Sequence, residues 1–174
     1  MAITQAEIKF YLTGGAGNTD PNASLGGAIS NTEIASGNLH NLFDKVTGDE
    51  SVAGDVEYRC LAVKNTHASL TWEAVRAYIR SNTPGDDTLE IGVETPSGGA
   101  LQTVVNESTA PTGIVFSAPA DRAAGLVCTG EGDSAGNIGP GHWVGIWVKR
   151  TVPAGAAAKD NNTATIEVSG DTAE

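Results

Sequence analysis

Residues 55–80 read DVEYRCLAVKNTHASLTWEAVRAYIR, and the architecture expected for the rest of the chain follows from them. A period of two in β-forming residues predicts a strand over the first half. Asn65-Thr66-His67 then interrupts the run with turn-forming residues, and a second apolar run follows from Leu70 to Ile79. The two runs predict a long β-hairpin at the centre of a sheet. The alternation divides the first strand into two faces, Val56, Tyr58, Cys60 and Ala62 on one and Glu57, Arg59, Leu61 and Val63 on the other.

The second run also fits a helix. Trp72, Val75 and Ile79 have helical spacing, and the Glu, Ala and Arg residues between them favour a helix. A helix of about nine residues is marginal in stability without strong caps. We therefore favour a strand here and keep the helix as the alternative.

Strand-like runs recur along the chain, with turn-forming residues between them. Residues 37–46 fit either a helical turn or an edge strand, residues 47–51 form an acidic turn, and residues 118–127 have the composition of a helical turn. No repeat or linker divides the chain. We predict a single all-β domain over residues 1–174, an antiparallel β-sandwich of jelly-roll or immunoglobulin-like Greek-key type. The expected further strands are 7–12, 28–34, 88–94, 100–105, 113–116, 143–148, which is apolar on both faces and therefore central, and 163–168.

The three tryptophans lie in the most apolar runs. An exposed set of tryptophans would suit a sugar-stacking platform, but tryptophans in such runs are more often part of a core. Cys60 and Cys128 have no metal-ligand spacing, and we expect two buried, reduced thiols. The predicted core is Tyr58, Leu61, Trp72, Ile79, Ile91, Trp143, Ile146 and Trp147.

The charge balance restricts the class of partner. The chain has 10 basic and 21 acidic residues and a net charge of -11. Affinity for nucleic acid and for anionic membranes depends on clustered Lys and Arg, so we expect neither as a partner. No N-terminal signal pattern and no apolar run of membrane-spanning length is found in the sequence.

No motif in the sequence predicts catalysis, a cofactor or a metal ion. Gly132-Asp133-Ser134-Ala135-Gly136 matches G-x-S-x-G, but a nucleophile elbow needs a helix after the serine, and Asn137-Ile138-Gly139-Pro140-Gly141 cannot begin one. We therefore expect no enzyme. The histidines lack metal-ligand spacing, and the acidic clusters follow no calcium-loop pattern, so structural or solvated roles are expected for His40, His67, His142, Asp49-Glu50, Asp86-Asp87 and Glu131/Asp133.

Two long segments are poor in apolar residues. Residues 14–27 and 153–162 cannot order themselves by burying their own side chains, and long loops in compact domains are often interaction elements. The strands beside them, 7–12 and 163–168, are short and terminal, so we expect them at sheet edges. Residues 1–27 would then act as an assembly arm in a homo-oligomer or in a larger particle.

Three segments resemble small β-rich virion proteins of tailed bacteriophages. They are IKFYLTGGAGNTDPNASLGGAIS at 8–30, GDESVAGDVEYRCLAVKNTHASLT at 48–71, and HWVGIWVKRTVPAGAAA with NTATIEVSGDT near the end. The resemblance implies a non-enzymatic virion protein, assembled in the host cytoplasm, that binds other virion subunits. Capsid decoration or cementing is the leading expectation, and a neck, collar or tail component is the alternative. A carbohydrate-binding module is the alternative from another class, and it would need solvent-facing tryptophans.

Overall fold

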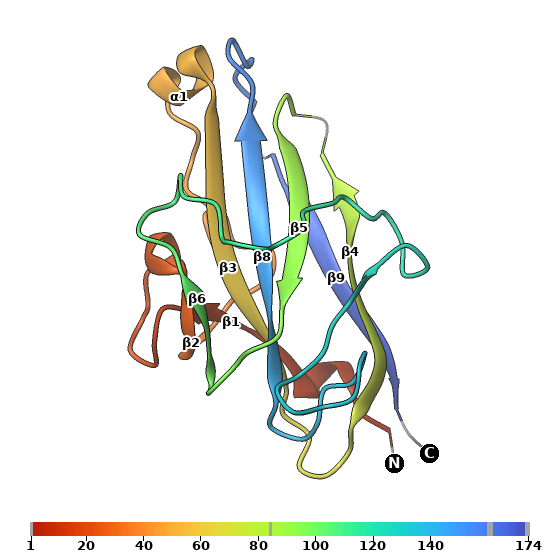
Figure 1. Cartoon of the computed structure of the whole chain (residues 1–174). Coiled ribbons are helices and arrows are strands. Elements are labelled where there is room, and N and C mark those ends of the chain that lie inside the picture. The colour runs from red at the N-terminus through yellow and green to blue at the C-terminus, as the bar shows by residue number, and fades with distance from the viewer. Residues whose placement is uncertain (1, 84, 160–161, 173–174) are drawn as a thin grey trace.

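The computed structural model describes residues 2–83, 85–159 and 162–172, and it contains two antiparallel sheets packed face to face (Figure 1). The larger sheet has the order β5-β8-β3-β1-β2-β6 and the smaller one β7-β4-β9. The prediction of an all-β antiparallel sandwich is confirmed. The strands are β1 Ile8–Thr13, β2 Gly26–Glu33, β3 Asp55–Asn65, β4 Trp72–Asn82, β5 Thr88–Glu94, β6 Ala100–Thr103, β7 Leu126–Val127, β8 Trp143–Val152 and β9 Ala164–Thr172, and the helical segments are η1 Gln5–Glu7, η2 Pro21–Ala23 and α1 Gly48–Ala53.

The central stretch forms two strands, β3 and β4, but not the expected hairpin. β3 pairs with β1 and β8 in the larger sheet, whereas β4 pairs with β7 and β9 in the smaller one. Residues 66–71 therefore cross between the two sheets. The crossing is held by Asn65, whose Nδ2 donates to the carbonyls of Leu70 at 2.8 Å and Ile138 at 3.0 Å. A turn signal predicts that the chain reverses, but not whether the next strand pairs with the first or faces it across a core.

A bulge in β4 explains why its sequence also fits a helix. The register with β9 shifts between Glu73 and Arg76, and Ala74 there has a φ of 50°. The additional residue turns Trp72 and Val75 toward the same core although they are three positions apart. An apolar spacing of three, which resembles a helical period, thus arises in a bulged strand.

Most of the other expected strands are present, with shifted ends. Segment 88–94 is β5 as predicted, 143–148 extends to Val152 as β8, and 163–168 extends to Thr172 as β9. Segment 113–116 is not a strand, since only a single bridge joins the adjacent Ser117 to Ile91.

The expectations for the irregular segments need correction. Residues 37–46 form turns and bends rather than a helical turn or an edge strand, and residues 118–125 contain a turn but no helix. The acidic turn at 47–51 is the start of α1. Its capping box consists of Thr47, whose Oγ1 accepts from the Glu50 N–H at 3.3 Å, and of Glu50, which accepts from the Thr47 N–H at 2.6 Å.

The larger sheet is buried on both faces. One face packs against the smaller sheet, and its core includes Leu61 and Val63 of β3. The other face carries a second cluster around Cys60, Ala62, Trp143 and Trp147, which is covered by loops together with residues of β2 and β6. All predicted core residues are buried except Tyr58, which is half-buried.

The N-terminal strand is not at a sheet edge. β1 lies between β3 and β2, so the expectation that 7–12 is an edge strand is wrong, while β9 is at an edge of the smaller sheet as predicted. Of the second long segment, residues 160–161 lie outside the described residues. The preceding part contacts α1, because the N–H groups of Gly155 and Ala156 donate to the Ser51 carbonyl.

Candidate functional site: an uncharged face over the larger sheet

Two segments cover the second core cluster, and together they form what we call the uncharged face: residues 14–30 and residues 95–120. Both send apolar side chains into the same cluster. They are Leu25 and Ile29 from the first segment and Leu101, Val104, Ile114 and Phe116 from the second. Figure 1 shows the second segment crossing in front of β3, β8 and β5.

A buried polar network orders the first segment. Ser24 is fully buried, and its Oγ donates to the Cys60 carbonyl at 2.6 Å and accepts from the Thr13 N–H at 2.8 Å. The Cys60 N–H in turn donates to the Ser24 carbonyl at 2.8 Å. The loop is thus paired to the edge of β3 beyond the end of β1. The expectation that this segment could not order itself overlooked hydroxyl groups as internal partners.

The second segment is anchored in its middle and near its end. In its middle, the Tyr58 N–H donates to the Glu107 carbonyl at 2.7 Å. Near its end, Ile91 and Ser117 exchange two backbone hydrogen bonds of 2.7 and 3.0 Å, and Phe116 packs on the Tyr58 ring with centroids 5.5 Å apart. These contacts fix the segment across the width of three strands.

A shallow hollow lies where the two segments meet. Gly14, Gly15, Ala23, Leu25, Gly26, Gly27, Ala28, Thr103 and Val104 line it. Gly26 is required there because its φ is +89° and a Cβ atom would lie 1.9 Å from the Gln102 carbonyl oxygen and 2.9 Å from the Trp147 ring. Directly after the hollow, Val105 is 86% exposed.

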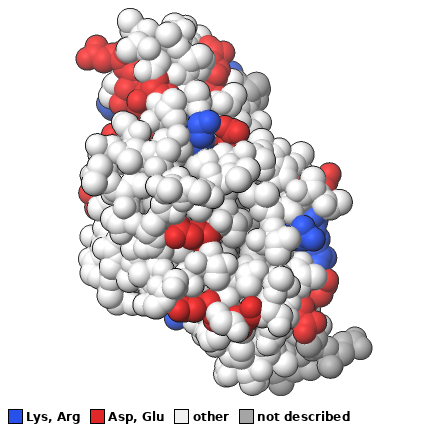
Figure 2. Space-filling model, viewed as in Figure 1, with Lys and Arg blue, Asp and Glu red and all other residues white. Residues whose placement is uncertain are grey.

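Charged residues are nearly absent from both segments. Residues 14–30 contain only Asp20 and residues 95–120 only Glu107, although 18% of the whole chain is charged. Asp20 accepts from the Asn22 N–H at 2.9 Å as the cap of η2, and Glu107 pairs with Arg59. Figure 2 shows the same view with few charges over its middle, one acidic group among them, and more charges around α1 and along the lower and right-hand margins. The uncharged face is therefore poorer in charged residues than the acidic surface around it.

Sequence reasoning missed a cluster of buried charges. Glu57 and Arg59 lie on the core-facing side of β3, and Arg150 of β8 is also buried. The Arg150 Nε donates to Glu57 Oε2 at 2.5 Å, and both guanidinium groups stack on the Phe43 ring, at 4.7 Å for Arg150 and 5.6 Å for Arg59. Burial raises the pKa of Glu57, and the charge of Arg150 acts in the opposite direction. The sequence did indicate this cluster, because the alternation places Glu57 and Arg59 on the same face of the strand as Leu61, which was expected in the core.

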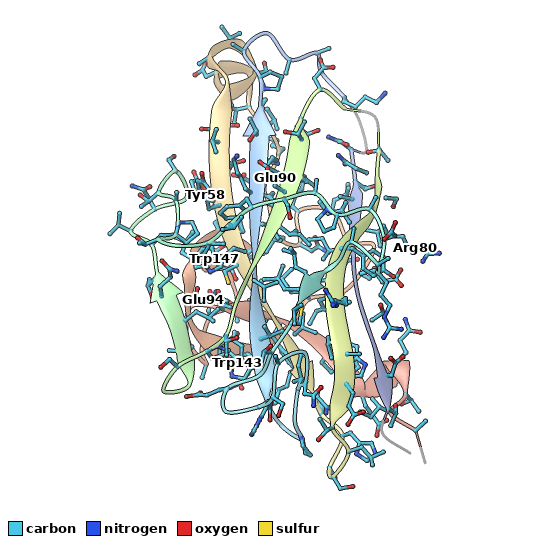
Figure 3. All side chains as sticks on the ribbon, turned by 45° about the vertical axis from the view of Figure 1, so that its right-hand side comes forward. Tyr58, Arg80, Glu90, Glu94, Trp143 and Trp147 are labelled. Atoms are coloured by element: carbon cyan, nitrogen blue, oxygen red, sulfur yellow. The ribbon has the colours of Figure 1, made fainter. Side chains whose placement is uncertain are left out.

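The exposed face of the smaller sheet carries paired charges. Glu167 of β9 accepts from the Tyr78 hydroxyl at 2.5 Å and from Arg80 at 2.9 Å, and the Tyr78 hydrogen bond is the main cause that lowers the pKa of Glu167. Arg122 pairs with Asp171 at 2.7 Å, which lowers the pKa of that carboxyl. Arg80 points away from the sandwich in Figure 3. These side chains satisfy one another and leave no arrangement that suggests a reaction.

The tryptophans cannot form a sugar-stacking platform, because all three are buried. Trp147 is fully enclosed, and its Nε1 donates to Glu94 Oε2 at 2.6 Å; Figure 3 shows the two labelled side chains side by side. The requirement stated for a carbohydrate-binding module is therefore not met.

Ser134 lies in a turn region between β7 and β8. Neither a strand directly before it nor a helix directly after it is present, so the geometry of a nucleophile elbow is missing from this described part of the chain.

The histidines and acidic clusters lie in separate loops. The Asp133 carboxylate is 2.9 Å from His142 Nδ1, and His67 Nδ1 accepts from the N–H groups of Ser69 and Leu70. His40 is exposed in a turn. Within the described ranges, no group of three or more His, Cys, Asp or Glu residues is placed to hold a metal ion. Several of the acidic side chains, expected to be solvated, instead accept backbone N–H groups, namely Glu50, Asp86, Glu131 and Asp133.

Both cysteines are free and buried, as predicted. Burial raises the pKa of the Cys128 thiol to about 12 and that of Cys60 well above its usual value. A thiol with so little thiolate at neutral pH is a poor nucleophile. The cysteines therefore act as core residues.

Comparison with known protein families, with curated proteins and with solved structures found no match to this chain. Among the described residues, no helix is long and apolar enough to span a membrane.

Proposed function

We propose that this chain is a non-enzymatic structural protein of a tailed bacteriophage virion, and that it decorates or cements the outer surface of the capsid. The observation that carries the proposal is the separation of charge over the surface. One ordered, uncharged face lies on a chain whose net charge is -11. Depletion of charged residues is characteristic of the cores of protein interfaces.

The packing of the interior also favours a binding site on the surface of the protein over a cleft for a small molecule. Both faces of the larger sheet are filled with packed side chains, and the hollow beside β6 is shallow and lined mainly by glycine and apolar residues. Small-molecule sites usually combine a deep apolar cavity with a few convergent polar groups. A broad uncharged face with only a shallow hollow is better suited to another protein.

The acidity favours the outside of the particle. Phosphate backbones bind proteins through clustered Lys and Arg, so an acidic surface disfavours contact with packaged DNA. The part of the uncharged face around Val115 would contact the capsid, and the acidic remainder would face solvent.

The test is to bind the purified protein to heads of the same phage that lack it. The variant Val115→Glu places a charge on the uncharged face at a side chain that is 81% exposed, and Val52→Glu is the matched control on α1, at 76% exposed. We expect Val115→Glu to weaken co-sedimentation with heads at least tenfold and Val52→Glu to leave it unchanged. Absence of the protein from purified virions would refute the virion role. Density at the neck or tail, in a map of the particle, would replace decoration by the neck, collar or tail alternative.

A further inference from the structure

The hollow on the uncharged face has a protruding side chain directly beside it. Thr103 and Val104 line the hollow, and Val105 is the next residue. Val104 is buried, with its N–H donating to the Leu25 carbonyl at 3.1 Å, whereas Val105 is 86% exposed. Removing apolar surface from water is favourable, so a valine this exposed leaves a gain that a partner covering it would supply.

A protrusion next to a depression on the same patch is complementary to itself. In a contact with twofold symmetry, the same patch of each subunit faces the other, so the valine of each copy meets the hollow of its partner. A ring or filament would instead need the protrusion and the hollow on different sides of the molecule.

The charge distribution favours a second copy at this place. Two molecules with a net charge of -11 repel each other over most of their surfaces. The carboxylates near the hollow already have partners. Asp20 caps η2, Glu107 pairs with Arg59, and Glu94 accepts from the Gln102 N–H and from Trp147 Nε1, so two copies can approach there without placing unpaired carboxylates opposite each other. A contact of ordinary size takes about 800 Å² from each partner, roughly a tenth of the 8639 Å² surface of this chain.

We propose that two copies of this chain form a twofold dimer in which Val105 of each copy inserts into the hollow of the other. The dimer is independent of the virion role, because it uses the end of segment 95–120 next to β6. Val115, which was assigned to the capsid contact, lies at the other end of that segment, beside Gly92 of β5.

The dimer is tested by sedimentation equilibrium of the full chain at several protein concentrations, with three variants. Val105→Glu changes the protrusion, Ala28→Glu changes an exposed residue that lines the hollow, and Val52→Glu is the control on α1. We expect the parent and Val52→Glu to be dimers. Val105→Glu and Ala28→Glu should each raise the dimer dissociation constant at least tenfold while keeping the melting temperature of the monomeric domain.

Salt gives a second measurement. The Debye length falls from about 30 Å at 0.01 M to about 8 Å at 0.15 M salt, so repulsion between acidic copies weakens and the dimer should become tighter. A dimer that dissociates with added salt would be held by ion pairs and would contradict the proposal. A parent protein that stays monomeric at every concentration and salt level, or a dimer unaffected by Val105→Glu and Ala28→Glu, would also overturn it. A negative result for the dimer does not change the outcome of the head-binding test with Val115→Glu. Failure of the dimer proposal can therefore be distinguished from failure of the virion proposal.

Discussion

Replacing Arg150 by methionine should be among the most damaging single changes in this protein. The side chains of Arg150 and Glu57 are 9% and 2% exposed, and the substitution leaves the Glu57 carboxylate buried without its closest partner. Arg59 is still near, but at 3.9 Å from Glu57 Oε1. Breaking a buried ion pair on one side costs about 3–5 kcal/mol. Domains have about 5–15 kcal/mol of total stability, so the loss would be a large share of it.

The neighbouring residue provides a matched control. Lys149 pairs with Glu90 at 2.7 Å, but the two side chains are 27% and 34% exposed. An ion pair of this kind contributes about 0–1 kcal/mol, so Lys149→Met should be nearly neutral. Both variants remove one cation from adjacent positions of β8, and they differ mainly in the burial of the carboxylate left behind.

Urea unfolding at constant m-value measures the difference. The double variant Glu57→Leu/Arg150→Met should recover most of the loss, because removing both charges leaves no buried carboxylate. The loss in Arg150→Met should also shrink from pH 8 to pH 5. Without Arg150 the pKa of Glu57 rises further in the folded state, so the folded protein takes up the proton first and lower pH favours it. If Arg150→Met costs less than about 1 kcal/mol, or the double variant is as unstable as the single one, this account of the buried charges is wrong.

Three further outcomes are expected. Trp147→Ala should cost about 3–5 kcal/mol in urea unfolding, since the indole is fully buried; a variant melting within a degree or two of the parent would contradict the core assignment. Stability should fall between pH 9 and pH 12, because the unfolded Cys128 thiol ionises there while the folded one, with a pKa of about 12, does not. This loss is up to about 4 kcal/mol. Cys128→Ala should remove this share and leave the share due to Cys60, whose pKa burial also raises. Deleting residues 1–13 removes an inner strand and should abolish the cooperative unfolding transition seen by circular dichroism, whereas a folded truncated protein would restore the assembly-arm hypothesis.

The sequence predicted those elements whose burial follows a simple period. Segment 88–94 alternates cleanly and became β5, and segment 143–148 is apolar on both faces and became the inner strand β8. The burial of the tryptophans and cysteines followed from the same patterns. In each case the local sequence pattern and the packing of the whole fold favour the same structure.

The errors arose where contacts distant in sequence decide the outcome. Whether β3 and β4 pair or face each other depends on β8, β1 and β9, which supply their actual neighbours. A terminal position does not indicate an edge, because β2 and β6 continue the sheet beyond β1. The run of uncharged residues in 95–120 could be recognised in the sequence, but its position beside 14–30 requires the β2–β6 pairing, which no local pattern shows.

The buried charges and the uncharged face are physically connected. Glu107 is the single charged residue of segment 95–120, and its carboxylate is bound by Arg59, a guanidinium that is itself fully enclosed. The same Arg59 donates to the Asn22 side chain at 3.2 Å, in the other segment of the face. One buried arginine therefore both holds the two segments against β3 and compensates the charge that would otherwise interrupt the face. Burying a charge in the core is costly, and even a paired buried charge adds little stability. We therefore explain the buried Arg59 by its effect on the surface, where it holds the two segments in place and neutralises Glu107.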